Sequence, residues 1–438
     1  MFKTLRDMFR IKDIRKKLFF TFLMLILIRF GSQLPIPGVN RSYFQQWFAQ
    51  QNNGAFSFFS AFTGGSFERM SVFALNITPY ITASIIMELL SIAIPALEEM
   101  HRDGEDGRKK ITTITRYLTV GLALFEGSVM AIGFGRSGLI RNFNFFTALV
   151  VIFGLTAGSA FIMWIGERIT ENGIGNGISI VLVINIISRI PQDLTTLWSQ
   201  FVAGKTVAKG AVALIIIIAV ILLTVVLTIL LTSAVRRIPV QYAKKMQGRR
   251  MVAGQSSSIP LKVNTAGVIP VIFASSLMSI PSIILSFTGK NVTGGAAIFF
   301  GMLNQNNWFN LSHPVYLIGL AIYILLCVFF AYFYTSITFN PIEVADNLKK
   351  QGGFIPGIRP GKPTSEYLKK VLNYIIFIGA IGLMIVVIIP IFFNGVFNAN
   401  VSFGGTSLII IVGVVLETIE QIESQMLVRN YKGFLRES

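Results

Sequence analysis

The feature that most constrains this chain is a series of long apolar runs separated by short polar or basic segments. A helix of about 20 mostly apolar residues is long enough to cross the hydrocarbon core of a bilayer. Ten runs qualify, at 18–34, 72–94, 112–135, 145–166, 176–191, 211–234, 264–287, 314–338, 370–393 and 405–427. Helices satisfy their own backbone hydrogen bonds in lipid, so the pattern predicts an all-α polytopic membrane protein.

Composition agrees with a membrane protein. Only 13% of the 438 residues are charged, whereas a soluble domain carries about 25%. The single cysteine, Cys327, excludes a disulfide framework within the chain, and its apolar surroundings favour a buried small side chain. The first apolar run follows a basic segment but lacks a small-residue cleavage site, so we expect a span rather than a cleavable signal peptide. The run at 176–191 is short and is closed by Pro191, which predicts a span that is tilted or flanked by protein.

The distribution of basic residues predicts the orientation. An even number of spans places both termini on one side, and 29 of the 38 Lys and Arg residues fall on that side against 8 on the other. The positive-inside rule therefore predicts cytoplasmic termini. The polar connection near 192–210 divides the chain into 1–195 and 196–438, with five spans each. Two tandem halves with an odd number of spans have opposite topology, which indicates an inverted repeat.

Two large segments on the predicted cytoplasmic side are unusual. Residues 236–262 and 339–369 are rich in Lys and Arg, and the first contains no acidic residue. Alternating side chains near both ends of 236–262 predict a short hairpin. Such loops can act as topology signals that are attracted to anionic lipid. Their size and predicted structure favour the alternative, a docking surface for a partner.

The stretch 64–90 does not divide into a loop and a span. A short polar piece with two glycines and a Glu-Arg pair passes directly into an apolar run that is broken by Pro79. Such backbone is tolerated at membrane depth only where protein or a water-filled cavity surrounds it. We therefore expect this stretch to line, and to block, a path through the membrane.

Candidate chemical groups are few. Glu88 and Glu126 lie within predicted spans, where charges often mark coupled transport, but neither has an opposite charge at similar depth and interhelical hydrogen bonds are favoured. Two histidines and one cysteine do not match the ligand spacing of a zinc site. Residues 357–364, GIRPGKPT, have three residues between the glycines and a proline after the lysine, unlike a phosphate-binding loop. We expect no metal, no cofactor and no enzymatic activity.

Motifs along the chain resemble those of the SecY family, the main subunit of the bacterial protein-conducting channel. GSQLPIPGV follows the first span, FTGGSFERMSVFAL precedes ITPYITASIIMELL, and ERITENGIGNGISI leads into the fifth span. RRIPVQYAKK and FNPIEVADNLKKQGGFIPGIRPG fall in the two basic loops, and FGGTSLIIIVGVVLET opens the tenth span. These fragments occur in the family's order and cover nearly the whole chain.

The resemblance implies ten transmembrane helices in two inverted five-helix halves around a central hourglass pore. It implies a ring of apolar side chains at the constriction, called the ring residues below: Ile77, Ile81, Ile178, Leu182, Ile272 and Ile410. It also implies a short re-entrant plug helix at about 56–67, the plug segment, and a lateral gate between spans 2–3 and spans 7–8. The plug residues are Phe62, Gly64, Gly65 and Phe67, with the glycines as a hinge. Thr82 and Ile280 match positions that face each other across the gate.

The family's partners are also implied. The basic loops match its docking surface for the SecA motor and for the ribosome, whose RNA is recognised largely through phosphate charge and shape. The basic positions concerned are Lys244, Lys245, Arg249, Arg250, Lys349, Lys350 and Arg359. Small SecE-type and SecG-type subunits, the translocating polypeptide with its signal sequence, and membrane lipid complete the expected partners.

The resemblance predicts a passive channel in the bacterial cytoplasmic membrane, driven by SecA or the ribosome. It would move unfolded secretory proteins across the membrane and release transmembrane segments sideways into lipid. The alternatives are a secondary transporter of small solutes, which needs a polar midplane site, and a receptor or scaffold that uses only the basic loops.

Three positions depart from the family pattern. Asn76 stands where glycine is common, Glu88 where glutamine is usual, and Leu182 where isoleucine is usual. Leucine is equally bulky and apolar, so the seal should survive. The added polarity of Asn76 and Glu88 near the gate predicts a slightly easier opening, which an ion-leak assay of Asn76→Gly would test.

Overall fold

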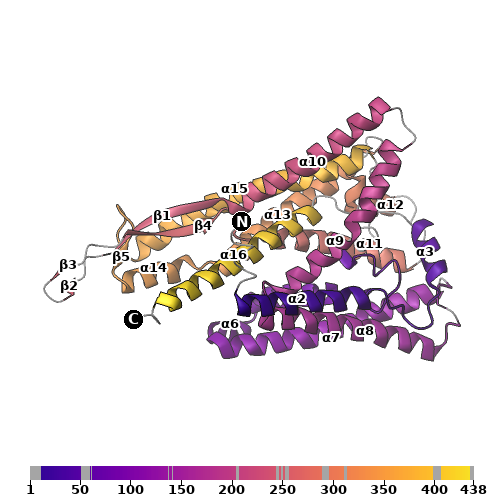
Figure 1. The fold of residues 1–438 in the computed structure, drawn as a ribbon, viewed down its shortest axis with the longest axis horizontal. Coiled ribbons are helices and arrows are strands. Elements are labelled where there is room, and N and C mark those ends of the chain that lie inside the picture. Colours follow the sequence, from indigo (N-terminus) through magenta and orange to yellow (C-terminus); the bar gives the residue numbers. More distant parts are fainter. Residues whose placement is uncertain are drawn as a thin grey trace.

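The computed structural model describes most of the chain as helix (Figure 1). The described residues are 11–50, 60, 62–136, 138–140, 142–203, 207–242, 246–247, 250–251, 256–288, 295–309, 313–397 and 406–434. The long helices are α2 (Lys12–Gly31), α5 (Thr78–Ala93), α7 (Gly104–Arg136), α8 (Phe145–Asn172), α9 (Gly177–Leu197), α10 (Val207–Ser233), α11 (Ile269–Thr288), α13 (Leu317–Thr338), α15 (Lys362–Phe397) and α16 (Thr406–Phe434). Each of the predicted apolar runs overlaps one of these helices.

Six helical stretches in the described part of the chain are long and apolar enough to cross a membrane. They are Gly104–Arg136, Phe145–Asn172, Gly177–Val202, Ala208–Ser233, Pro314–Lys350 and Lys362–Phe393. Thr78–Ala93 and Ile269–Pro281 are shorter apolar helices. The connections carry short helices: α3 (Arg41–Gln50), α6 (Pro95–Arg102), α12 (Gly295–Leu303) and α14 (Pro341–Lys350). The described structure is therefore that of a polytopic helical membrane protein.

The helices form two groups. Figure 1 shows α2, α7 and α8 along one side of the molecule, and α10, α13, α15 and α16 along the other. Helix α5 packs against α7, and α11 packs against α13. Helix α9 packs against α8 of the first group and α16 of the second, so it connects the two. Cys327 is fully buried in α13, as its apolar surroundings predict.

Two prolines act differently from the prediction. Pro79 lies in the first turn of α5, where a missing backbone N–H costs nothing, so it starts the helix rather than breaking it. Turns precede Thr78, so the helix begins six residues later than the predicted span. Pro191 lies inside α9, which continues to Leu197 and then forms a π-helical turn at Trp198–Val202. Pro191 therefore does not close the span, although it removes one helical hydrogen bond.

The two basic loops share one small sheet. Strands β1 (Val235–Tyr242) and β4 (Ser256–Lys262) pair antiparallel, which confirms the predicted hairpin. Strand β5 (Gly353–Phe354), from the second loop, pairs with the other edge of β1. Short strands β2 (Met246–Gln247) and β3 (Arg250–Met251) extend the hairpin, which projects beyond the helices in Figure 1. Beneath the sheet, buried side chains of both loops form one apolar cluster with α15.

Candidate functional site

The ring residues lie in one apolar cluster, called the central cluster. Four of them are buried: Ile77, Leu182, Ile272 and Ile410 have exposed fractions between 0 and 7%. Ile81 and Ile178 are partly buried and pack against the central cluster. Five of the side chains come from α5, α9, α11 and α16, and Ile77 immediately precedes α5, so the cluster joins helices of both predicted halves. Their role as a ring stays a prediction, because the central cluster also contains many other residues.

Asn76 connects the start of α5 to its surroundings. Its φ of +52° lies in the left-handed region, which glycine prefers and asparagine tolerates better than most residues, so this backbone accounts for the exchange. The Asn76 side-chain Nδ2 donates to the carbonyl oxygen of Phe62 at 2.8 Å. Ser159 of α8 donates to the Asn76 carbonyl at 3.0 Å. Asn76, the residue that precedes Ile77, thus links Phe62 of the plug segment to α8, and its effect on opening stays a prediction.

The plug segment is described at Ser60 and at 62–67, whereas 56–59 and 61 lie outside the described residues. Phe62 is 8% exposed and packs into the central cluster. Phe67 is 1% exposed but packs into a second cluster, edge-to-face with Phe44 and tilted against Phe134. The two aromatic residues assigned to the plug therefore anchor different ends of it, one at the ring and one away from it.

Gly64 and Gly65 turn the chain between these two anchors. Both have positive φ, +62° and +78°, which glycine adopts without strain. A Cβ on Gly64 would lie 2.9 Å from the backbone Cα and O of Asn185 on α9, whereas a Cβ on Gly65 would meet nothing within 4 Å. Gly64 is thus required for close packing as well as for conformation. The hinge role of the pair stays a prediction.

An ion pair joins α9 to Glu68, the residue that follows the plug segment. Arg189 of α9 contacts Glu68 with 2.6 Å between Nη1 and Oε1. Ser60 donates its hydroxyl to the same Glu68 oxygen at 2.7 Å and also accepts a hydrogen bond from Arg189. The side chains of Arg189 and Glu68 are only 11% and 20% exposed. The sequence shows Glu68 as part of a Glu-Arg pair but does not indicate Arg189 as its partner, although an arginine inside the predicted span 176–191 was a usable signal.

The predicted lateral-gate residues do not share a described contact. Thr82 donates its hydroxyl to the carbonyl of Thr78, one turn earlier in the same helix, at 3.1 Å. Ile280 of α11 is 42% exposed. Their pairing across the gate stays a prediction.

Glu88 has one buried carboxylate oxygen without a hydrogen-bond partner in the described structure. Within the same residues, no group of three or more His, Cys, Asp or Glu side chains could hold a metal ion.

The predicted docking residues that the structure describes lie on the two basic loops, which share the β4–β1–β5 sheet. Lys349 and Lys350 form the exposed last turn of α14, where positive charge suits the helix dipole. Arg359 is exposed, and its carbonyl accepts a hydrogen bond from Thr364 at 2.8 Å. Arg250 lies on β3, at the tip of the hairpin. The remaining positions fall outside the described residues: Lys244, Lys245 and Arg249.

The arrangement of helices defines the class of protein, a polytopic helical membrane protein. The fold matches a solved structure of a protein conducting channel with a TM-score of 0.63 at 20% identity, covering 94% of this chain and 92% of that one. It also matches Sec61 in the canine ribosome-channel complex from the endoplasmic reticulum, with a TM-score of 0.59 at 18% identity, covering 94% and 92%. These likenesses concern the fold alone.

The chain belongs to the SecY family. The family profile matches residues 71–419. The protein translocase subunit SecY of Streptomyces galbus is 46% identical over 98% of both chains. The subunit of the same name from Halalkalibacterium halodurans is 44% identical over the full length of both. The resemblance inferred from the motifs is thereby confirmed.

Proposed function

We propose that this chain is the central subunit of a protein-conducting channel that moves unfolded secretory proteins across the bacterial cytoplasmic membrane. Its relatives are bacterial protein translocase subunits, and its fold is that of a protein conducting channel. The observation that carries the proposal is the central cluster, which contains the ring residues from four parts of the chain together with Phe62 of the plug segment. Such a seal suits passage of a chain, whereas a solute transporter needs a polar site.

In this proposal ten spans form two inverted halves, 1–195 and 196–438, around an hourglass pore. An apolar constriction excludes water and ions by dewetting, yet its side chains can part around a polypeptide. The re-entrant plug helix covers the ring from the outer side. Its closed position is supported by the amide contact of Asn76 and by the ion pair of Glu68 with Arg189. Among the solved neighbours is a SecY protein whose plug domain stabilises the closed state.

The lateral gate is proposed between two helix pairs. Helices α5 and α7 pack together, as do α11 and α13, and α7 also contacts α11. Separation of the two pairs would open a path from the pore to lipid beside Thr82 and Ile280. An apolar signal sequence would leave by this path because burial in lipid is favourable by about 25 cal/mol per Å² of apolar surface.

The shared sheet of the basic loops is proposed as the cytoplasmic docking platform, with both chain termini on the same side. Its exposed cations suit ribosomal RNA and the SecA motor, either of which would supply the energy. The solved neighbours include Sec61 in a canine ribosome-channel complex and the yeast Ssh1 complex bound to the yeast ribosome. SecE-type and SecG-type subunits would complete the complex. The chain itself is proposed to be a passive pore rather than an enzyme.

The test is photo-crosslinking of an arrested secretory chain to a probe at Ile81 or Ile272 in the complete translocase. A probe at Ile385, which is 52% exposed on α15, is the matched control outside the ring. Crosslinks at both ring positions and none at Ile385 are expected. Absence of ring crosslinks together with saturable solute uptake in vesicles would favour a secondary transporter. Absence of both would favour a receptor or scaffold.

A further inference from the structure

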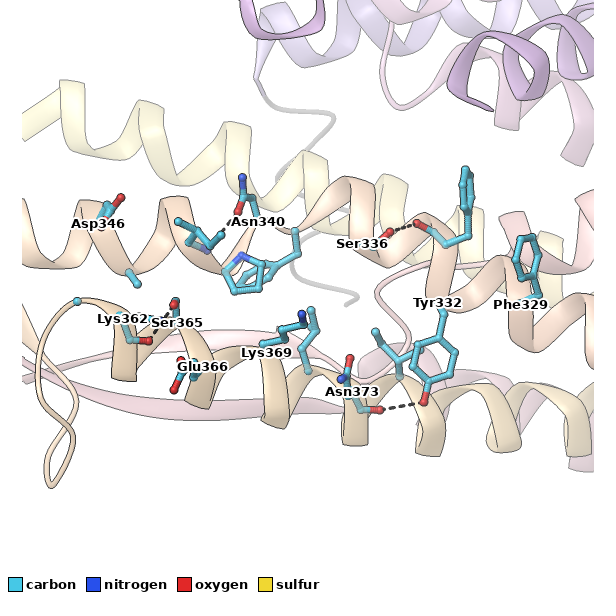
Figure 2. Close-up of a pocket in the computed structure, with 18 residues that line it drawn as sticks. Phe329, Tyr332, Ser336, Asn340, Asp346, Lys362, Ser365, Glu366, Lys369 and Asn373 are labelled. Carbon is cyan, nitrogen blue, oxygen red and sulfur yellow. Dashed lines mark hydrogen bonds between the residues drawn. The ribbon is translucent and has the colours of Figure 1, made fainter. Parts of the chain in front are cut away.

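A groove of about 910 Å³ runs between α13–α14 and α15 (Figure 2). This volume falls within the range of about 300–1,000 Å³ that small-molecule sites occupy. Its wall on α13 carries Phe329, Tyr332 and Phe333, and its floor on α15 includes the buried residues Leu372 and Ile376. Nothing in the proposed channel mechanism uses this groove.

The lining changes from charged to apolar along the groove. On α15 the lining residues Lys362, Glu366, Lys369, Asn373 and Ile376 recur every three or four positions, so they lie on one face of the helix. At 1.5 Å per residue this face extends about 21 Å. Figure 2 shows the charged side chains toward one end of the groove and the aromatic side chain of Phe329 toward the other. The groove is therefore amphipathic along its length.

The change in polarity falls where the membrane boundary is expected. The predicted spans end at 338 on α13 and begin at 370 on α15, and Ser336, Asn340 and Lys369 line the groove at this level. Beyond Phe329, the exposed apolar face of α13 continues with Leu325, which is 68% exposed. The apolar end of the groove thus opens onto the exposed apolar side of a predicted span.

The charges in the groove are balanced and available. Lys362 and Lys369 contribute two positive charges, and Asp346 and Glu366 contribute two negative charges. None of the four forms an ion pair with any described residue. A ligand that carries both signs complements this set, whereas a purely anionic ligand would also meet the two carboxylates.

We propose that the groove binds one aminophospholipid at the membrane boundary. Its phosphate would lie beside Lys369, its ammonium group beside Glu366, and one acyl chain along Phe333 and Phe329. Glu366 and Lys369 are separated by about 4.5 Å along the helix axis, which suits a phosphate and an amine joined by two carbons. The lipid would join α15 to α14, which bears Lys349 and Lys350 of the docking platform. The proposal requires a membrane location but not the channel function.

Native mass spectrometry of the full-length protein with added lipids tests the site. Phosphatidylethanolamine should be retained in preference to phosphatidylglycerol. Lys369→Gln and Glu366→Gln should each weaken its retention about fivefold, as expected for loss of one charge contact at a membrane surface. Lys370→Gln, one residue outside the groove, is the matched control and should change nothing. Equal losses in Lys369→Gln and Lys370→Gln, or equal retention of both lipids, would overturn the proposal.

A photo-crosslinking residue at Phe333, in membranes that contain the complete translocase, distinguishes lipid from a protein occupant. Adducts with the mass of phosphatidylethanolamine are expected. A probe at Phe377, which is 53% exposed on α15 and lies outside the groove, should label lipids without head-group preference. A polypeptide adduct at Phe333, or the same lipid mixture at both positions, would refute a selective lipid site.

Discussion

The two ends of the plug segment are held by different forces. Away from the ring, Glu68 and Ser60 contact Arg189 through a charged pair that is mostly buried. Nearer the ring, a neutral amide of Asn76 donates to Phe62, and Gly64, between the two anchors, fits closely against the backbone of α9. The charged end depends on burial, because ion pairs in water contribute little. The neutral end depends on shape, because a side chain added at Gly64 would meet backbone atoms of α9, which cannot move aside as a flexible side chain can.

The comparison implies an order of importance. Removing one partner of a buried ion pair leaves an uncompensated charge and costs about 3–5 kcal/mol when burial is complete. Removing one neutral hydrogen bond costs about 1 kcal/mol. The charged end should therefore contribute more to closure than the amide. Ion conductance of the resting translocase in lipid bilayers measures this, because a displaced plug uncovers the seal.

The largest effect is expected from Arg189→Glu, which places two carboxylates opposite each other. Since both side chains remain partly exposed, we expect a loss of about 2 kcal/mol, or roughly a 30-fold rise in resting conductance. The double variant Arg189→Glu with Glu68→Arg should restore most of the closure. Arg168→Glu is the control, because its pair with Glu171 is exposed on α8. A double variant that leaks as much as the single one would show that charge pairing does not hold this end.

The next effect tests shape at the neutral end with two adjacent glycines. An alanine in the left-handed region costs about 1 kcal/mol, so Gly65→Ala should raise resting conductance about fivefold. Gly64→Ala adds a clash with the backbone of Asn185, and we expect about a 20-fold rise. Equal conductance of the two variants would mean that the plug does not pack against α9 in the resting channel.

Asn76→Gly removes the amide donor but retains a residue suited to positive φ. Loss of one hydrogen bond to Phe62 should raise resting conductance about fivefold. This is the opposite of the expectation from sequence, in which the polar Asn76 eases opening. A fall in conductance in the same bilayer recording would restore that earlier expectation.

The smallest effect is expected at an exposed ion pair far from the plug. Lys262 of β4 contacts Glu420 of α16 at 2.5 Å, but their side chains are 46% and 52% exposed. Lys262→Gln should cost about 0.5 kcal/mol or less and leave resting conductance unchanged. Thermal unfolding in detergent would measure the stability change. A loss of stability as large as that expected for Arg189→Glu would contradict the idea that a buried ion pair contributes more stability than an exposed one.

Much of the fold followed from local patterns, whereas the proline interpretations did not. Apolar runs located the long helices, and alternation in the first basic loop located the β1–β4 hairpin. Pro191 was interpreted as a helix end because a local rule treats proline as a breaker. In the structure α9 continues past it, with α8 and α16 packed against that helix. A single proline removes one backbone hydrogen bond, and a local rule that treats it as a helix end does not decide whether the helix continues.

The candidate site likewise has features that the motifs predicted and features that only the structure shows. Motifs placed the ring residues and the plug segment, and the structure puts the six ring side chains in one cluster. No pattern indicated that Phe62 and Phe67, five positions apart, would join different clusters. Likewise, Glu68 and Arg189 are separated by 121 positions, and nothing in either neighbourhood specifies the other.

The sequence by itself determined which segments are apolar enough to span a membrane, how basic residues distribute between them, and which family the motifs belong to. These are properties of single segments, because the free energy of transfer to lipid depends on local composition. Only the tertiary structure decided that Arg189 meets Glu68, that Asn76 holds Phe62, and that β5 of one basic loop completes the sheet of the other. Such contacts depend on the packing of distant helices, which local composition does not specify.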